Sequence, residues 1–97
     1  MSRGRNHRME LYFESESIGE MDELLQKEGV EFLHGIVEQP WGQRVLRFYD
    51  PDGHVVELGE TMESVVKRFH GQGLADEEIV RRTSMPLEFV STNRSRA

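Results

Sequence analysis

The 97-residue chain contains no cysteine. This absence excludes disulfides, thiolate metal sites and cysteine nucleophiles together. Long apolar runs are also missing, because no stretch approaches the roughly 20 residues that a membrane-spanning helix needs. The first residues, Met1 to Arg5, lack the apolar segment of a signal peptide. The sequence therefore predicts a protein without a membrane partner, with a cytoplasmic location as the default.

Positive charge is scarce in the body of the chain. The formal net charge is −6, and five of the twelve basic residues stand near the two ends: Arg3, Arg5, Arg8, Arg94 and Arg96. Residues 9 to 90 are left with seven positive and eighteen negative groups, a balance of −11. Such an acidic body repels phosphate backbones, so we expect no nucleic-acid partner.

The composition that remains fits one small globular domain. Hydrophobic residues make up 36% and charged residues 31% of the chain, proportions that are typical of soluble proteins. Residues 1–7 are polar and basic without periodicity, and we expect a flexible lead-in there. We expect a single domain over residues 8–90 and a flexible tail over residues 91–97.

The order of periodic segments predicts strand, helix, strand, strand, strand. Residues 8–15 alternate between apolar and polar side chains, which is typical of a half-buried strand. The segment after Ser17 carries an apolar stripe at helical spacing. Ser17 and Glu20 fit a capping box at its start, and Gly29 fits its end. Residues 30–38 form a second predicted strand, in which Gly35 marks a bulge.

The strongest local signal is a hairpin. Two apolar runs, Arg44 to Tyr49 and His54 to Leu58, are separated by Asp50, Pro51, Asp52 and Gly53. Pro51 fixes the φ that a turn needs, and Gly53 accepts a positive φ without steric cost. After the hairpin, helical patterns follow Thr61, cover residues 76–83 and follow Pro86. We therefore expect a helical C-terminal extension.

Glu57 is the most conspicuous candidate site residue. It falls in the second strand of the hairpin among Val55, Val56 and Leu58, where a carboxylate needs a partner, a cavity or a metal. The structural alternative is an ion pair with Arg44 or Arg47 on the neighbouring strand. Three further residues each have an ordinary and a functional interpretation. His34, in the middle of a strand, is a strand residue or lines a cavity, and His54, just after the turn, faces solvent or acts as an acid/base group. Trp41 packs within its loop or stacks on a substrate.

The hairpin resembles the end of a module of the glyoxalase/bleomycin-resistance/extradiol-dioxygenase superfamily, the vicinal oxygen chelate proteins. The residues that carry the resemblance are Phe48 to Gly53 followed by Val56, Glu57 and Leu58. It covers residues 9 to 62 and is most similar to the second, C-terminal module of a two-module domain. It implies an α+β fold: one βαβββ module with a mixed four-stranded sheet in which the first and last strands are neighbours, followed here by C-terminal helices.

The resemblance also implies a site. The Glu after the turn is often a metal ligand, which corresponds to Glu57, and its partner on the first strand corresponds to Glu10, where many members have His. The divalent metal would be Mn, Mg, Fe, Ni or Zn. Oxygen ligands favour Mn²⁺ or Mg²⁺ over Zn²⁺. Tyr12 joins Glu57 as a catalytic candidate, and we expect four residues to bind substrate: Tyr12, His34, Trp41 and Arg47. From their own chemistry, the phenol of Tyr12 and the guanidinium of Arg47 are expected to hold an anionic or enolate-like ligand, because both can donate to negative charge.

Two functions follow from this resemblance. The first is a divalent-metal-dependent enzyme of lyase, isomerase or dioxygenase type that acts on a small oxygenated metabolite. The second is a non-catalytic, metal-free dimer that binds or sequesters a small ligand or antibiotic. Because a complete domain of the superfamily has two modules and this chain holds one, we expect a homodimer.

Overall fold

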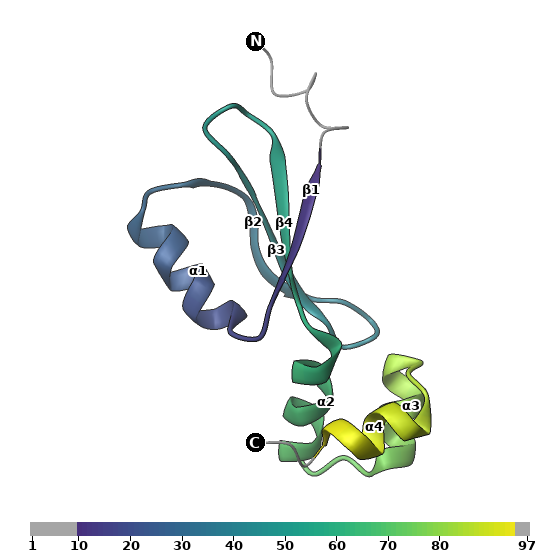
Figure 1. The fold of residues 1–97 in the computed structure, drawn as a ribbon. Coiled ribbons are helices and arrows are strands. Elements are labelled where there is room, and N and C mark those ends of the chain that lie inside the picture. Colours follow the sequence, from purple (N-terminus) through teal and green to yellow (C-terminus); the bar gives the residue numbers. More distant parts are fainter. Residues whose placement is uncertain (1–9, 95–97) are drawn as a thin grey trace.

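The computed structural model describes residues 10–94, so the predicted lead-in and the last three residues of the predicted tail lie outside the described part. The elements, in chain order, are β1 (Leu11–Ser15), α1 (Ile18–Lys27), β2 (Glu31–Glu38), β3 (Arg44–Tyr49), β4 (Val55–Glu60), α2 (Met62–Gly71), α3 (Asp76–Thr83) and α4 (Leu87–Asn93). This order confirms the predicted βαβββ module with C-terminal helices (Figure 1).

The four strands form one mixed sheet in the order β1-β4-β3-β2. The outer strand β1 runs parallel to β4, and the other two pairs are antiparallel. The first and last strands of the module are thus neighbours, as the resemblance predicted. Two register shifts in β2, between Phe32 and Val37, enclose Gly35 and agree with the predicted bulge.

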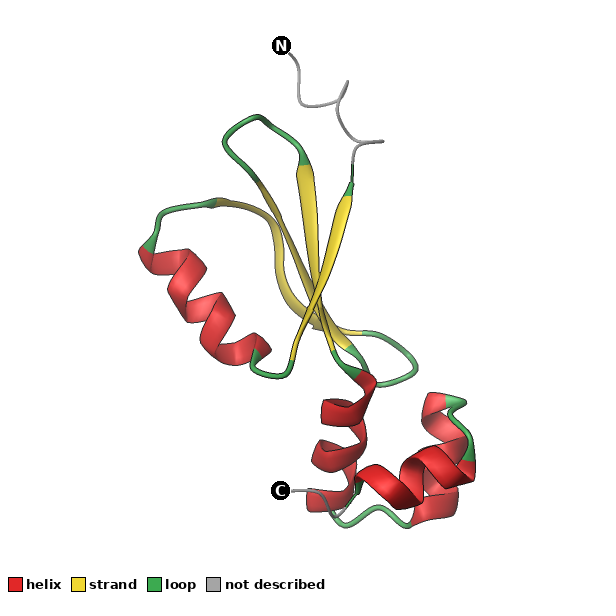
Figure 2. Cartoon of the chain, in the orientation of Figure 1, coloured by secondary structure: helices red, strands yellow, loops and turns green. Residues whose placement is uncertain are grey.

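Helix α1 covers one face of this sheet, as the ribbon shows (Figure 2). Its buried residue Ile18 packs with Leu46 and Leu58 at the centre of a core. Gly29 has φ +75 just after the helix, as predicted. The predicted capping box is wrong, because Ser17 makes no side-chain cap bond. The hydroxyl of Ser15 instead accepts a hydrogen bond from the backbone N–H of Ser17 at 2.9 Å. This N–H is the group that the Glu20 carboxylate would bind in a capping box.

The β3–β4 turn fixes the register of the hairpin. One carboxylate oxygen of Asp50 accepts the backbone N–H groups of Asp52 and His54, at 2.9 and 2.8 Å. Gly53 takes φ +86, which a residue with a side chain rarely adopts. Because Arg47 then pairs with Glu57, and Leu46 with Leu58, the register determines which face of the sheet each side chain of β4 occupies.

The C-terminal helices form a second core below the sheet (Figure 1). Its buried members are Val65, Val66, Phe69, Ile79 and Val90. Thr61 caps α2 as predicted, since its hydroxyl accepts the N–H of Ser64 at 3.1 Å. Helix α4 continues through Asn93, three residues past the predicted domain end. Over residues 10–94, no helix is both long and apolar enough to cross a membrane.

The junction between sheet and helices is built around Glu60, which is fully buried. Its carboxylate pairs with Arg44 of β3 at 3.2 Å and with Arg68 of α2 at 2.9 Å. Gly42 adds to the junction, because a Cβ at that position would lie 2.4 Å from the Phe69 ring. These contacts connect the second core to the lower end of the sheet.

Candidate functional site

The face of the sheet opposite α1, called the open face here, carries a polar row that crosses all four strands. His34, Arg47, Glu57 and Tyr12 are successive register partners on β2, β3, β4 and β1. Directly paired residues point to the same face of a sheet. Since Leu46 and Leu58, one position away, pack against α1, the row points away from that helix.

Arg47 lies between two carboxylates at the centre of this row. Its guanidinium contacts Glu57 at 3.1 Å and Glu10 at 3.4 Å. The side chains of Arg47 and Glu10 are 39% and 38% exposed, and that of Glu57 is 19% exposed. The structure therefore brings together three of the predicted site residues, and it also contains the ion pair that was the alternative interpretation of Glu57.

The pKa of Glu10 is raised above its ordinary value. A hydrogen bond with Glu57 raises it most, partial burial and the Glu57 charge add to the rise, and the Arg47 charge opposes them. One guanidinium thus serves two neighbouring carboxyl groups that compete for ionisation. Any cation that reached this position would meet oxygen donors, yet it would also have to compete with Arg47.

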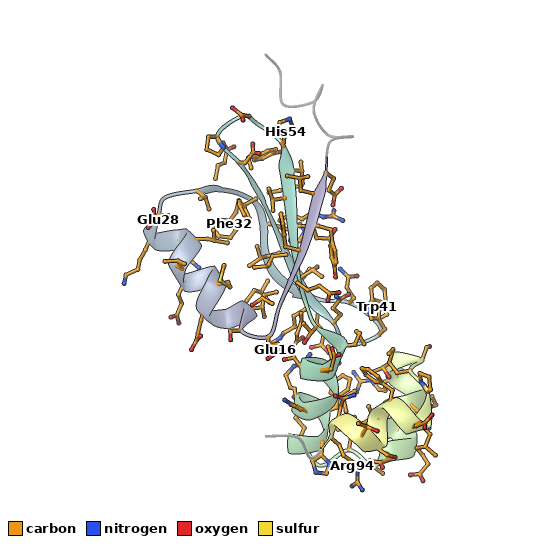
Figure 3. All side chains as sticks on the ribbon, viewed as in Figure 1. Glu16, Glu28, Phe32, Trp41, His54 and Arg94 are labelled. Carbon is orange, nitrogen blue, oxygen red and sulfur yellow. The ribbon has the colours of Figure 1, made fainter. Side chains whose placement is uncertain are left out.

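Tyr12 and Trp41 meet through a residue that the sequence did not single out. The Trp41 indole donates to the side-chain oxygen of Gln43 at 3.0 Å, and the Gln43 amide nitrogen donates to the Tyr12 hydroxyl at 3.0 Å. Trp41 lies on the side of the sheet away from α1 (Figure 3). The Tyr12 hydroxyl in turn donates to Glu14 at 3.0 Å.

The pKa of Tyr12 is raised, so the phenol stays neutral at physiological pH. Partial burial is the main cause; the hydrogen bond from Gln43 lowers the pKa, and Glu14 and the Glu57 charge raise it. His34 occupies the outer end of the row, where Nδ1 lies 2.8 Å from the carbonyl oxygen of Gly35. All the predicted substrate-binding residues therefore lie on or beside the open face.

The donor set of the predicted metal site is small. Glu10 and Glu57 offer carboxylate oxygens, whereas a divalent metal takes four to six donors. Within residues 10–94, one group of three potential metal-ligating side chains has its ligand atoms within 4.8 Å of one another, and it consists of Asp50, Asp52 and His54. The two glutamates of one chain therefore do not fit a complete metal site.

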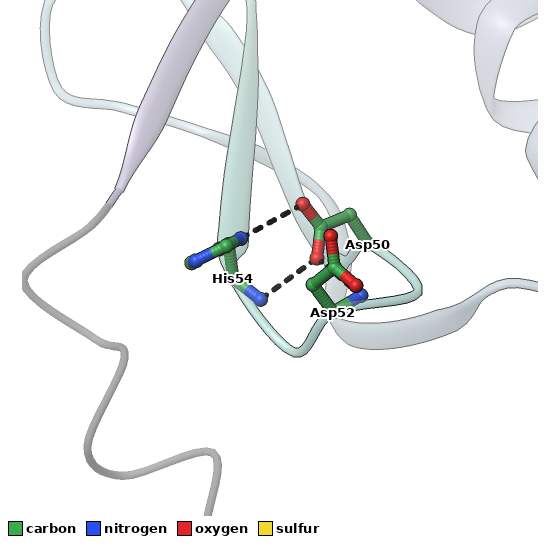
Figure 4. A group of neighbouring side chains, drawn as sticks. All are labelled: Asp50, Asp52 and His54. Carbon is green, nitrogen blue, oxygen red and sulfur yellow. Dashed lines mark hydrogen bonds and ion pairs between the residues drawn. The ribbon is translucent and has the colours of Figure 1, made fainter. Parts of the chain in front are cut away.

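The Asp50, Asp52 and His54 group lies at the tip of the β3–β4 turn (Figure 4). Asp50 accepts two backbone N–H groups there, and its second oxygen lies 3.2 Å from Nδ1 of His54. Burial alone would raise the pKa of Asp50, but the hydrogen bonds from His54 outweigh it and the pKa is lowered. These contacts explain the group as a turn-stabilising arrangement.

Gln43 and Gly59 are parts of the site that sequence reasoning missed. Glutamine in a loop and glycine in a strand carry no pattern that points to a binding site. Gly59 became informative only in three dimensions, because a Cβ at this position would lie 2.7 Å from the Tyr12 hydroxyl and 2.8 Å from the Gln43 amide nitrogen.

Comparison with known proteins bears on the family. A family model described as a glyoxalase-like domain matches residues 1–63. The chain belongs to the glyoxalase-like domain family. No curated protein matches it. The match ends two residues into α2, so most of α2 and all of α3 and α4 of this glyoxalase-like protein lie beyond the matched residues.

Solved structures agree with this assignment. A protein of unknown function from Agrobacterium tumefaciens str. C58 is 46% identical over 54% of this chain and 40% of its own, with a TM-score of 0.50. A member of the glyoxalase/bleomycin resistance protein/dioxygenase superfamily from Sphaerobacter thermophilus DSM 20745 is 35% identical over 53% of this chain and 41% of its own, with the same TM-score. TioX from Micromonospora sp. ML1, 20% identical with a TM-score of 0.52 over 53% of this chain and 42% of its own, shows the shared fold.

The matched part is therefore only about two-fifths of each relative's length. The whole-protein activity of such relatives is not carried over with the fold. What this chain shares with them is the fold of the matched βαβββ module.

Proposed function

We propose that this glyoxalase-like protein binds a small polar molecule on the open face, as a metal-free homodimer in which two modules enclose the ligand. The observation that carries the proposal is the polar row of His34, Arg47, Glu57 and Tyr12, in register across the whole sheet. Arg47 supplies the positive charge beside Glu10 and Glu57 that a metal would supply, and this favours the metal-free form.

The exposure of the row supports a second copy as the missing wall. Tyr12, on the outer strand β1, is 49% exposed, and the side chain of Arg47 in the same row is 39% exposed. A second module is available in the same protein if two chains associate. Size-exclusion chromatography with light scattering should give twice the monomer mass at micromolar concentration, whereas a monomer would contradict the dimer.

A divalent-metal-dependent enzyme of lyase, isomerase or dioxygenase type is the second candidate. The position of Glu10 and Glu57 side by side, with the pKa of Glu10 raised, favours it. Two modules in a dimer would bring four such carboxylates, and a metal held by them would act as a Lewis acid on oxygen atoms of the substrate.

Metal binding separates the two candidates. Isothermal titration with Mn²⁺ and Mg²⁺, together with elemental analysis of the purified protein, should give no stoichiometric binding if the proposal is right. Binding that disappears in the Glu10→Gln/Glu57→Gln double variant would establish the metal site instead. The matched control is Glu16→Gln/Glu23→Gln, which removes the same charge at exposed positions before and within α1.

A further inference from the structure

We infer that Gln43 sets the hydrogen-bonding polarity of the open face by holding the Tyr12 hydroxyl as an acceptor, so that the site takes ligand groups that donate, such as hydroxyl, amine or ammonium, rather than anions. This inference rests on the proposed small-ligand site and names the class of ligand for it. It assigns to Gln43 the part of a positioning residue, acting through Tyr12.

The orientation of the Gln43 amide is fixed by two neighbours of opposite kind. The Trp41 indole N–H can only donate, and it lies 3.0 Å from the side-chain oxygen. The backbone carbonyl of Glu60 can only accept, and it lies 2.9 Å from the side-chain nitrogen. An amide is often ambiguous between its two orientations. Here each neighbour alone excludes the flipped one, and Gln43 itself is only 9% exposed.

The polarity of Tyr12 follows from that orientation. The nitrogen of Gln43 must donate to the Tyr12 hydroxyl, because an amide nitrogen does not accept. The phenolic proton is then directed to the Glu14 carboxylate at 3.0 Å. A hydroxyl has one proton and two acceptor positions. What Tyr12 can still offer a ligand is therefore one acceptor position.

Gly59 makes room for this arrangement. A Cβ there would lie 2.7 Å from the Tyr12 hydroxyl and 2.8 Å from the Gln43 nitrogen, closer than real contacts allow. Gly59 is not among the described glycines with positive φ, so its backbone does not require glycine. The absence of a side chain at Gly59 leaves the space in which Tyr12 and Gln43 form their hydrogen bond above the sheet.

The groups around Tyr12 have the same polarity. Glu10 and Glu57 accept hydrogen bonds when ionised, and the guanidinium of Arg47 is directed to both of them. With Glu14 counted, this part of the sheet carries three carboxylates and one arginine. A ligand that donates hydrogen bonds satisfies these acceptors, whereas a carboxylate or phosphate would face hydrogen-bond acceptors and groups of like charge.

Titration of Tyr12 tests the inference without any ligand. In a Tyr49→Phe background Tyr12 is the sole tyrosine of the chain, and the absorbance of phenolate reports its ionisation. Gln43→Met should raise the apparent pKa of Tyr12, because a hydrogen bond to the phenolate is lost. Glu14→Gln should lower it, because a carboxylate no longer binds the phenolic proton. Gln26→Met, on the exposed side of α1, is the matched control and should leave the titration unchanged.

Two further readouts separate polarity from a general effect on folding. Trp41 is the single tryptophan, so its one indole N–H resonance should move in Gln43→Met and stay in place in Gln26→Met. Gly59→Ala should shift the Tyr12 titration, whereas Gly35→Ala should not, because a Cβ at Gly35 meets nothing within 4 Å. Since Glu14 is exposed, Glu14→Gln keeps the test available if Gln43→Met does not fold.

A matched pair of probes tests the ligand class. 1-Amino-2-propanol and lactate have similar size and opposite charge, and amide resonances of β1 and β4 report binding in NMR titrations. We expect shifts with the amine that Gln43→Met weakens, and larger shifts with lactate would overturn the inference. Unchanged tyrosine titrations in both Gln43→Met and Glu14→Gln would overturn the role of Gln43. Opposite titration shifts without a response to either probe would keep that role and contradict the proposed binding site instead.

Discussion

Glu57 and Glu60 stand on the same strand, β4, and each pairs with an arginine of β3, yet their surroundings differ. Glu57 faces the open side, is 19% exposed, and shares Arg47 with a second carboxylate. Glu60 is completely buried and has two arginines, Arg44 and Arg68, to itself. The group around Glu57 has two carboxylates and one guanidinium, whereas the cluster around Glu60 has one carboxylate and two guanidiniums.

This difference separates a structural ion cluster from a candidate site. Both oxygens of Glu60 are occupied, because the cluster also includes the backbone N–H of Arg44 and the hydroxyl of Ser64. Burial alone would raise the pKa of Glu60, but the bonds from Arg68 and Arg44 outweigh it and hold the pKa below its ordinary value. No capacity is left for a ligand there, whereas the Glu10–Arg47–Glu57 group remains half-exposed and unevenly charged.

The largest expected effect in this comparison is that of Glu60→Gln. We expect the free energy of unfolding to fall by about 3 kcal/mol, because two arginines lose a buried anionic partner. Urea denaturation followed by circular dichroism measures this. The matched change Glu57→Gln should cost about 1 kcal/mol or less, since its arginine is well exposed and retains Glu10. Equal costs for the two variants would break the distinction between structural cluster and site.

The pH dependence sharpens the same comparison. The pKa of Glu60 is lower in the folded protein than its ordinary value of 4.5. Its stabilising contribution is therefore present above that value and is lost as the pH falls through the folded pKa. The stability difference between the unaltered protein and Glu60→Gln should shrink on acidification below about pH 4, and a constant difference would contradict the lowered pKa.

Much of the fold could be predicted from local patterns. The Asp50–Gly53 turn, the alternation before Ser15 and the stripe after Ser17 identified the elements of the module. That β1 and β4 are neighbours was implied by the family resemblance and not by these patterns. The capping box failed because a fitting pair of residue types does not fix side-chain geometry: the Ser15 hydroxyl takes the N–H of Ser17 instead.

The candidate site was predictable only in part. Glu57 stood out because a carboxylate interrupts an apolar strand, and that signal is a local one. Glu60 sits just as close to apolar residues, but its burial depends on Arg68, which arrives from a different element. Gln43 and Gly59 gain their meaning from contacts with Tyr12 across the sheet, and such contacts between distant residues leave no periodic trace in the sequence.

The second expected effect is that of Arg47→Met, which leaves Glu10 and Glu57 without their shared cation. We expect a loss of about 1 kcal/mol in the free energy of unfolding at neutral pH, because the pair is partly exposed. The loss should be smaller at pH 5 than at pH 8, since protonation of one carboxyl relieves the repulsion. Denaturation at both pH values measures this, with Arg81→Met, at an exposed position of α3, as the control. An equal loss at both pH values would show that the two carboxylates do not repel each other.

The smallest expected effect is that of Glu10→Gln, and its direction distinguishes a site from a scaffold. The pKa of Glu10 is raised, first by its hydrogen bond with Glu57, so the ionised form is disfavoured in the folded protein and its cost grows as the pH rises through that pKa. An amide keeps the shape, removes the repulsion and can still donate to Glu57. Between pH 4 and 7 the variant should therefore gain stability relative to the unaltered protein, ending neutral or stabilised by about 0.5 kcal/mol, while exposed Glu16→Gln shows no such trend.

If Mn²⁺ or Mg²⁺ raises the melting temperature of the unaltered protein, Glu10→Gln should abolish that rise, because binding to the folded form would need this carboxylate. A loss of several kcal/mol would instead make Glu10 a structural partner of Arg47, like Glu60 with Arg68, and would remove the open face from consideration as a metal site.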